Sequence, residues 1–166
     1  MTTSNIIAVY ADGGVIGRNP SAIGGTWAFC AVDAAGLRLI ERSGTLHPAE
    51  CGGPVSNNQA EYYALVNALE AMPAGWSGAV CSDSMVSLGR IFKGWKTDNL
   101  PEWMVSRAQA AMARLGWTWC VLLDGHPTKA HLAADVGKRG HPVSEHNVWC
   151  DARCQEEARK AKEAQV

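Results

Sequence analysis

The 166-residue sequence predicts an α/β domain in which a mixed five-stranded sheet carries helices on both faces. Three apolar segments come first and are joined by short polar turns, as in an antiparallel sheet. Two later apolar segments are each reached through a helical segment, and such crossovers normally place strands parallel. The length suits one domain, so we expect a single domain over residues 1–166, with residues 1–4 and about 160–166 as frayed ends.

The first three predicted strands are apolar runs separated by turn-forming residues. Ile6–Ala11 is unbroken apolar or aromatic sequence, which is typical of a strand buried on both faces. Gly24–Asp33 and Leu37–Leu46 are the next two strands, and the letters DAAG between them predict a hairpin. A polar loop rich in glycine and proline follows over Pro48–Val55.

The second half of the chain alternates helices with strands. In SNNQAEYYALVNALEAM, Ser56 and Gln59 have the spacing of a capping box, so a helix begins there, and Pro73 marks its exit. The later elements are strand Gly78–Ser82, a short helix from Asp83, a helix from Pro101 to about Leu115 that stops at Gly116, strand Trp117–Leu123, and a last helix from Ser144 or Glu145. A long loop punctuated by glycines precedes that last helix.

The composition is that of an ordinary globular protein, with 47% hydrophobic and 19% charged residues. The formal net charge is −1, so a partner held by a strong overall positive field is not indicated, whereas a nucleic acid remains compatible with clustered basic groups. The sequence has no apolar run long enough to span a membrane and no signal-peptide pattern. Three of the six cysteines lie in apolar runs, and we expect a cytoplasmic protein with reduced thiols.

Four acidic residues occupy positions where a charge is costly. Asp12 ends the first strand and Asp83 ends the fourth, and ligands collect at the carboxyl ends of parallel strands. Glu61 and Asp151 each lie on the otherwise apolar stripe of a predicted helix, so both point towards the sheet. Each alone could be a cap, a turn residue or a first-turn acid. Together they predict a shared site for a hard divalent cation, because neighbouring carboxylates repel and oxygen ligands favour Mg²⁺ or Mn²⁺ over zinc.

Four segments of the chain match, in order, the motifs of a known family: VYADGG, NNQAEYYAL, SDS and HNVWCD. On these motifs the sequence resembles the type 1 ribonuclease H family over nearly its whole length. The resemblance implies the ribonuclease H-like fold and an endonuclease that hydrolyses the RNA strand of RNA–DNA hybrids, leaving 5′-phosphate and 3′-hydroxyl ends. It further implies a two-metal-ion mechanism with two Mg²⁺ ions, or Mn²⁺ in their place, held by Asp12, Glu61, Asp83 and Asp151.

The same resemblance implies residues that contact the substrate. Asn57, Asn58 and Gln59 lie at the start of the first long helix, where the family contacts the minor groove. The two asparagines are equally explained as helix-starting residues, and both roles can hold together. Ser84, beside the third carboxylate, is implied to touch a backbone phosphate. Gly13–Gly14 is expected to leave room for a phosphate backbone to approach.

The family also has a mobile histidine near its last aspartate, and two residues match it. His126 matches by its position after the fifth strand, and His141 matches by its spacing before Asp151. We take His126 as the catalytic histidine and keep His141 as the alternative. An apparent insertion, Pro127–Gly140, separates the two.

Two further features depart from the family pattern. The lysine-rich protrusion that grips the hybrid in many bacterial members is reduced to three cations between Arg90 and Lys96, which predicts modest affinity for the hybrid. His146, Cys150 and Cys154 lie at i, i+4 and i+8 of the last helix, and a zinc site could be drawn from them. Buried thiols are the better explanation, because one helix seldom offers more than two consecutive ligands.

The leading hypothesis is therefore a metal-dependent ribonuclease H that acts on RNA–DNA hybrids as a monomer, with no organic cofactor and no membrane partner. One alternative is a DNA nuclease or resolvase-like member of the same superfamily. Another is a hybrid-binding module without catalysis. All four carboxylates are present, which argues against that module, because nothing physical would retain four crowded acids in a protein freed from catalysis.

Overall fold

One mixed sheet organises the protein, whose computed structural model describes residues 5–116, 125–127 and 144–165. The elements are β1 (Ala8–Val15), β2 (Gly25–Val32), β3 (Arg38–Leu46), α1 (Pro48–Cys51), α2 (Asn57–Ala71), β4 (Ala79–Ser82), α3 (Met85–Phe92), α4 (Glu102–Leu115), β5 (Gly125–Pro127) and α6 (Glu145–Ala164). In the part of the chain described here, no helix is long and apolar enough to cross a membrane.

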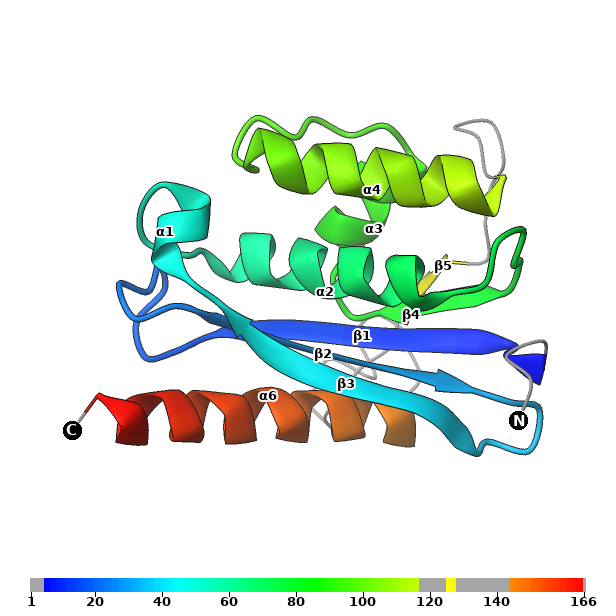
Figure 1. Cartoon of the computed structure of the whole chain (residues 1–166), viewed down its shortest axis with the longest axis horizontal. Coiled ribbons are helices and arrows are strands. Elements are labelled where there is room, and N and C mark those ends of the chain that lie inside the picture. The colour runs from blue at the N-terminus through cyan, green and yellow to red at the C-terminus, as the bar shows by residue number, and fades with distance from the viewer. Residues whose placement is uncertain (1–4, 117–124, 128–143, 166) are drawn as a thin grey trace, which may run out of the picture.

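The strands lie in the order β3-β2-β1-β4-β5 (Figure 1). The pairs β1–β2 and β2–β3 are antiparallel, whereas β1–β4 and β4–β5 are parallel. This arrangement confirms the predicted five-stranded mixed sheet. It also makes β1 the central strand, with an antiparallel neighbour on one side and a parallel neighbour on the other.

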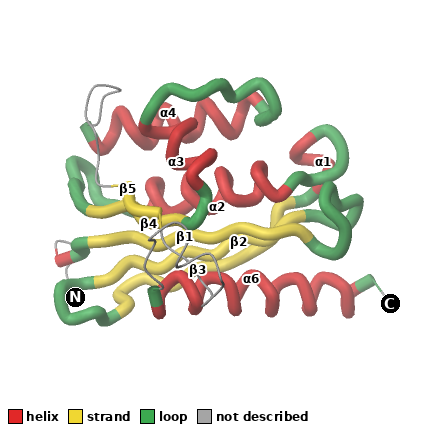
Figure 2. The backbone as a smooth tube through the Cα atoms, turned by 180° about the vertical axis from the view of Figure 1, so that it is seen from behind, coloured by secondary structure: helices red, strands yellow, loops and turns green. Residues whose placement is uncertain are grey.

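Helices cover both faces of the sheet, as predicted. Helices α2, α3 and α4 lie on one face and α6 lies on the other (Figures 1 and 2). Helix α2 packs on β1 and β2, and α6 packs on β1, β2 and β3 from the opposite side. Strand β1 is therefore covered from both sides, which explains the unbroken apolar run at its start.

Helices α2 and α6 begin at a side-chain cap, whereas α4 does not. Ser56 caps α2 and forms the predicted capping box with Gln59. Ser144 caps α6, in agreement with the predicted start of that helix. Gly116 ends α4 in the left-handed conformation, at φ 77°. Pro101 is the N-cap of α4 rather than its first helical residue.

Two predicted boundaries are wrong. Strand β1 continues to Val15, so Asp12 lies inside the strand and pairs with Ala28 of β2 instead of ending it. The strand continues because β2 supplies an antiparallel partner along its full length. The predicted Pro48–Val55 loop contains the short helix α1, which His47 and Glu50 stabilise through a reciprocal capping box.

The end of the sheet differs in part from the prediction. The predicted strand Trp117–Leu123 lies outside the described residues. The described strand β5 covers Gly125–Pro127, where the sequence predicted a loop. Pro127 is tolerated there because β5 is an edge strand, where a missing backbone N–H breaks no ladder between two strands.

Candidate metal centre

Three carboxylates from separate elements meet beside β1. Asp12 lies on β1, Glu61 lies on α2, and Asp83 follows β4 directly. One ligand oxygen from each residue lies within 4.8 Å of the others, so the three could hold a metal ion. We call these three residues the carboxylate trio.

The parallel register of β1 and β4 explains why Asp12 and Asp83 are neighbours. Tyr10 pairs with Cys81 at the end of that ladder. Asp12 and Asp83 each come two residues later, so they extend from the same edge on the same side. Their predicted proximity is confirmed, although it arises from the register and not from a shared strand end.

Glu61 reaches the trio because α2 packs directly on the backbone of β1. A Cβ atom at Gly13 would lie under 3.0 Å from backbone atoms of Ala60 and Glu61, a distance that real Cβ atoms do not show. The space beside Gly13 is thus filled by the helix. The expectation that Gly13 leaves room for a phosphate backbone is therefore wrong, since its missing side chain admits α2 instead.

The environment of Asp12 disfavours a negative charge. The residue is only 6% exposed, and burial raises the pKa of its carboxyl well above the usual range. The neighbouring carboxylates Asp83, Asp151 and Glu61 raise this pKa further, whereas a 3.0 Å hydrogen bond from the backbone N–H of Gly13 lowers it. A bound divalent cation would relieve both the burial cost and the repulsion.

Asp151 approaches this centre from the opposite face of the sheet. It lies on α6 and is close enough to raise the pKa of Asp12, but it is not part of the mutual 4.8 Å group. Gln155 holds it through a 2.9 Å hydrogen bond from Nε2 to the Asp151 Oδ2 atom. The structure thus brings three predicted ligands together and places the fourth beside them.

Asn57 orients one of the trio. Its Nδ2 atom donates a 3.0 Å hydrogen bond to Oε1 of Glu61, one helical turn further along α2. Sequence reasoning assigned Asn57 to substrate or to the helix start and missed this contact, although the i, i+4 spacing indicates it. Asn58 is exposed at the same helix end.

Gln59 links the start of α2 to a distant loop. Its Oε1 accepts from the backbone N–H of Ser56, and its Nε2 donates to the carbonyl of Asn99 at 3.0 Å. The loop before α4 is thereby fixed to the start of α2. Among the described residues, the Gln59 side chain is occupied by these structural contacts, and its substrate role stays a prediction.

Ser84 has a structural role in the helix that follows Asp83. It is the N-cap of α3, and its hydroxyl accepts from the backbone N–H of Ser87 and donates to the Ser87 hydroxyl. The predicted start of α3 at Asp83 is therefore one or two residues early. Contact of Ser84 with a phosphate stays a prediction.

Of the two candidate histidines, only His126 lies in the described part of the chain. The backbone of His126 lies in β5 and pairs with Cys81 of β4, which is two residues before Asp83. This position corrects the expectation that His126 follows the strand. His141 lies outside the described residues, so the choice between them stays a prediction.

The thiols of α6 pack against the sheet. Cys150 and Cys154 are buried, and Sγ of Cys150 lies 4.0 Å from Sγ of Cys30 on β2. Sγ of Cys154 donates to the backbone carbonyl of Asp12 at 3.4 Å. In the described ranges the carboxylate trio is the single group that could hold a metal, so the zinc alternative through His146 has no support.

Comparisons with known proteins agree with this geometry, although no family model matches the chain. The ribonuclease H of Anaeromyxobacter sp. (strain K) is 33% identical over 143 residues, which are 76% of this chain and 74% of that protein. The N-terminal RNase H domain of Rv2228c from Mycobacterium tuberculosis has a TM-score of 0.61 at 19% identity, covering 96% and 99% of the two chains. LC11-RNase H1 in complex with an RNA/DNA hybrid has a TM-score of 0.55 at 21% identity, covering 93% and 97%.

The fold therefore matches RNase H domains throughout the compared length, and the sequence match extends over three quarters of the chain. This chain belongs to the ribonuclease H family.

Proposed function

We propose that this protein is an endonuclease that hydrolyses the RNA strand of RNA–DNA hybrids, leaving 5′-phosphate and 3′-hydroxyl ends. The carboxylate trio carries the proposal, because three acids from three elements converge within 4.8 Å on a buried strand. A protein of the same fold, LC11-RNase H1, has been crystallised with an RNA/DNA hybrid, which supports this class of substrate.

The donor set suits hard divalent cations. The trio offers oxygen atoms alone, and Asp151 adds a fourth carboxylate from the other face of the sheet. We therefore assign two Mg²⁺ ions, with Mn²⁺ able to replace them. When bound, such ions activate the attacking water and stabilise the leaving 3′ oxygen.

The chain's own residues set the geometry of the reaction. Asp12 is the most buried member of the trio and would hold the ions together with Glu61 and Asp83, and Asn57 holds Glu61 in place. Asn58 is free at the helix surface to meet the minor groove of the hybrid. His126, with His141 as the alternative, is assigned to proton movement near Asp151.

Cleavage assays with labelled duplexes test the proposal. RNA–DNA hybrid, RNA duplex and DNA duplex are each incubated with Mg²⁺, Mn²⁺ or EDTA. We expect cutting of the RNA strand of the hybrid alone, and none in EDTA. Equal cutting of the DNA duplex would point to a DNA nuclease, and metal-independent binding without cutting would point to a hybrid-binding module.

The variant Asp12→Asn, measured in the same cleavage assays, tests whether the carboxylate trio carries the activity. Removing this buried carboxylate should lower hybrid cleavage at least about 1000-fold, because the site would lose one of its metal ligands. The circular-dichroism spectrum should stay that of the wild type. Retention of more than a tenth of the activity would remove Asp12 from the mechanism.

We also propose that the protein acts as a monomer in the cytoplasm. The five cysteines of the described residues are all free, which suits a reducing compartment. Size-exclusion chromatography with light scattering tests the monomer, for which a mass near 17.7 kDa is expected.

A further inference from the structure

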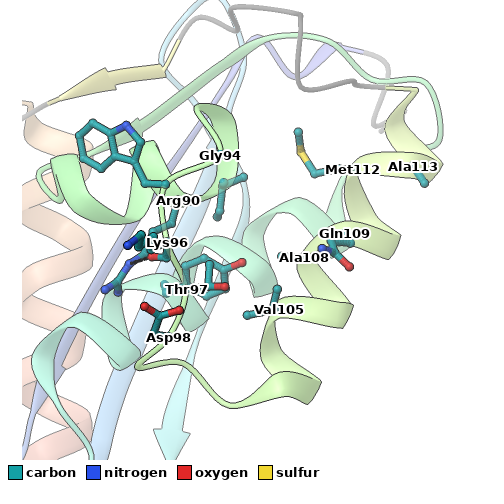
Figure 3. A pocket seen from close by; sticks show the side chains of 13 residues that line it. Arg90, Gly94, Lys96, Thr97, Asp98, Val105, Ala108, Gln109, Met112 and Ala113 are labelled. Carbon is teal, nitrogen blue, oxygen red and sulfur yellow. Dashed lines mark hydrogen bonds between the residues drawn. The ribbon is translucent and has the colours of Figure 1, made fainter.

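A pocket of about 680 Å³ lies on the α2 side of the sheet, between α3, the loop that follows it, and α4. Figure 3 shows Arg90, Lys96 and Asp98 on one side of this pocket and Val105 and Met112 of α4 on the other. None of the carboxylate trio lines it. The pocket is therefore separate from the carboxylate trio, although Arg90 and Lys96 belong to the segment that corresponds to the family's basic protrusion.

One hydrogen-bond donor of a residue that lines this pocket has no acceptor among the described residues. The Nη1 atom of Arg90 is buried without a partner, although Nε of the same guanidinium donates to the carbonyl of Lys96 at 3.1 Å. Tyr62, which is 2% exposed, also lines the pocket and carries a hydroxyl group. A buried donor without an acceptor costs free energy, so Arg90 favours a ligand that supplies one.

The charge and shape of the pocket define that ligand. Arg90 and Tyr62 both line the pocket, so one ligand in it can meet both side chains. A guanidinium prefers an oxyanion, and Lys96 adds a second positive charge, so the two cations outnumber the one carboxylate of this wall, Asp98. The opposite wall on α4 is mostly apolar, with Val105, Ala108 and Met112, and also includes Gln109. Apolar walls with a few converging polar groups are typical of small-molecule sites.

We propose that this pocket binds a small organic anion, in which a carboxylate or phosphate oxygen meets Arg90 and Tyr62 and an aromatic or aliphatic body lies on α4. The anionic group could belong to a carboxylic acid or to a mononucleotide, since both offer the same oxygen acceptors. The volume is of the size that holds one such molecule.

Isothermal titration calorimetry of the full chain in EDTA tests the proposal without metal or hybrid, so the result is independent of nuclease activity. The probes are 2-naphthoate, adenosine 5′-monophosphate, the neutral 2-naphthamide and inorganic phosphate. We expect 2-naphthoate, the nucleotide or both to bind, with 2-naphthamide and inorganic phosphate each at least about tenfold weaker. Which of the first two binds more tightly identifies the source of the anion. Absence of binding by both at millimolar concentration overturns the proposal.

Matched variants locate the site. Arg90→Gln should weaken binding about tenfold, and Tyr62→Phe about threefold, because each removes one donor at nearly constant volume. Arg159→Gln removes an exposed arginine on α6 and should leave the affinity unchanged. Equal loss in Arg90→Gln and Arg159→Gln, or ligand-induced amide shifts confined to segments other than Tyr62 and residues 90–113, would contradict the assignment. If Arg90→Gln melts at a lower temperature than the wild type, Tyr62→Phe and the amide shifts decide.

Discussion

The two faces of the sheet are built from different kinds of side chain. On the α2 face, large residues such as Phe29, Leu65 and Leu69 are buried in one continuous cluster. On the α6 face, the buried cluster is smaller and consists of alanine, valine and thiol side chains. The α2 face therefore removes much more apolar surface from water, and the hydrophobic contribution to stability is larger there.

The α6 face also buries polar groups that lack partners. Asn147 is 0% exposed, and in the described ranges neither its Oδ1 nor its Nδ2 atom has a hydrogen-bond partner. His146, its neighbour, is buried against the ring of Tyr10 at a centroid distance of 5.1 Å. The unpartnered amide of Asn147 costs free energy that an apolar side chain would not, whereas His146 has Arg38 and Glu145 as partners.

The candidate metal centre takes its carboxylates from helices on both faces of the sheet. Glu61 stands on the strongly packed helix α2, and Asp12 and Asp83 stand on the strands beneath it. Asp151 stands on α6, which packs on the smaller buried cluster. Glu61 is thus held by a helix of the larger cluster, whereas the position of the fourth carboxylate depends on the docking of α6.

The largest expected effect separates the two cores. Leu65→Ala should lower the free energy of unfolding by about 2–5 kcal/mol, because it opens a cavity in the α2 cluster. Cys154→Ala removes a single sulfur atom from the α6 cluster and should cost about 1 kcal/mol. Urea denaturation of the full chain measures both. Equal losses would show that the two faces contribute equally to the free energy of unfolding, which would contradict the larger hydrophobic contribution of the α2 face.

The second expected effect concerns the contact between β1 and α2. Gly13→Ala should lower the free energy of unfolding by about 1–3 kcal/mol, because the new methyl group meets the helix backbone and pushes Glu61 away. Binding of Mn²⁺, measured by calorimetry, should weaken with it. Gly14→Ala is the control, since a Cβ there would have only the Thr26 hydroxyl as a close neighbour, at 3.3 Å. Similar Mn²⁺ affinities in both variants would contradict the role given to Gly13.

How far the sequence could predict this centre depends on how local each signal is. The stripe of Glu61 and the caps at Ser56 and Ser144 are local patterns, and the structure reproduces the elements they predict. The proximity of Asp12 and Asp83 followed from strand order alone and holds as well. Local periodicity and strand polarity were thus sufficient to gather the acids at one edge of the sheet.

What the sequence could not predict depends on contacts between distant segments. Strand β1 continues past Asp12 because it pairs with β2. Gly13 is needed because α2 packs so closely on β1 that a side chain would not fit. The pocket beside Arg90 exists because α4 lies opposite the loop after α3. Each of these features belongs to tertiary packing, which single-chain patterns do not encode directly.

A third, smaller effect tests the repulsion inside the trio. Because the pKa of Asp12 is raised in the folded state, folding keeps a proton that the unfolded chain releases, so stability falls as pH rises from about 4 through the folded pKa. Asp12→Asn removes this cost and should raise the free energy of unfolding in EDTA at pH 7 by about 1 kcal/mol. The melting temperature between pH 4 and 8 measures it, and a lower melting temperature for the variant at pH 7 would contradict the crowding.

The smallest expected effect probes the α6 face through His146. Burial lowers the pKa of its imidazole, and the guanidinium of Arg38, with Nη1 3.3 Å from Nδ1, lowers it further, whereas Glu145 raises it. A lowered folded pKa means that stability is fully present above the unfolded value of about 6.5 and is lost as pH falls below it. The loss should stay under about 1 kcal/mol near pH 5.5, because Glu145 offsets part of the cost. Urea denaturation at pH 7.5 and 5.5 measures it, and His146→Gln should show a smaller decrease over this interval than the wild type. A decrease of the same size in both proteins would assign the pH dependence of stability to groups other than His146.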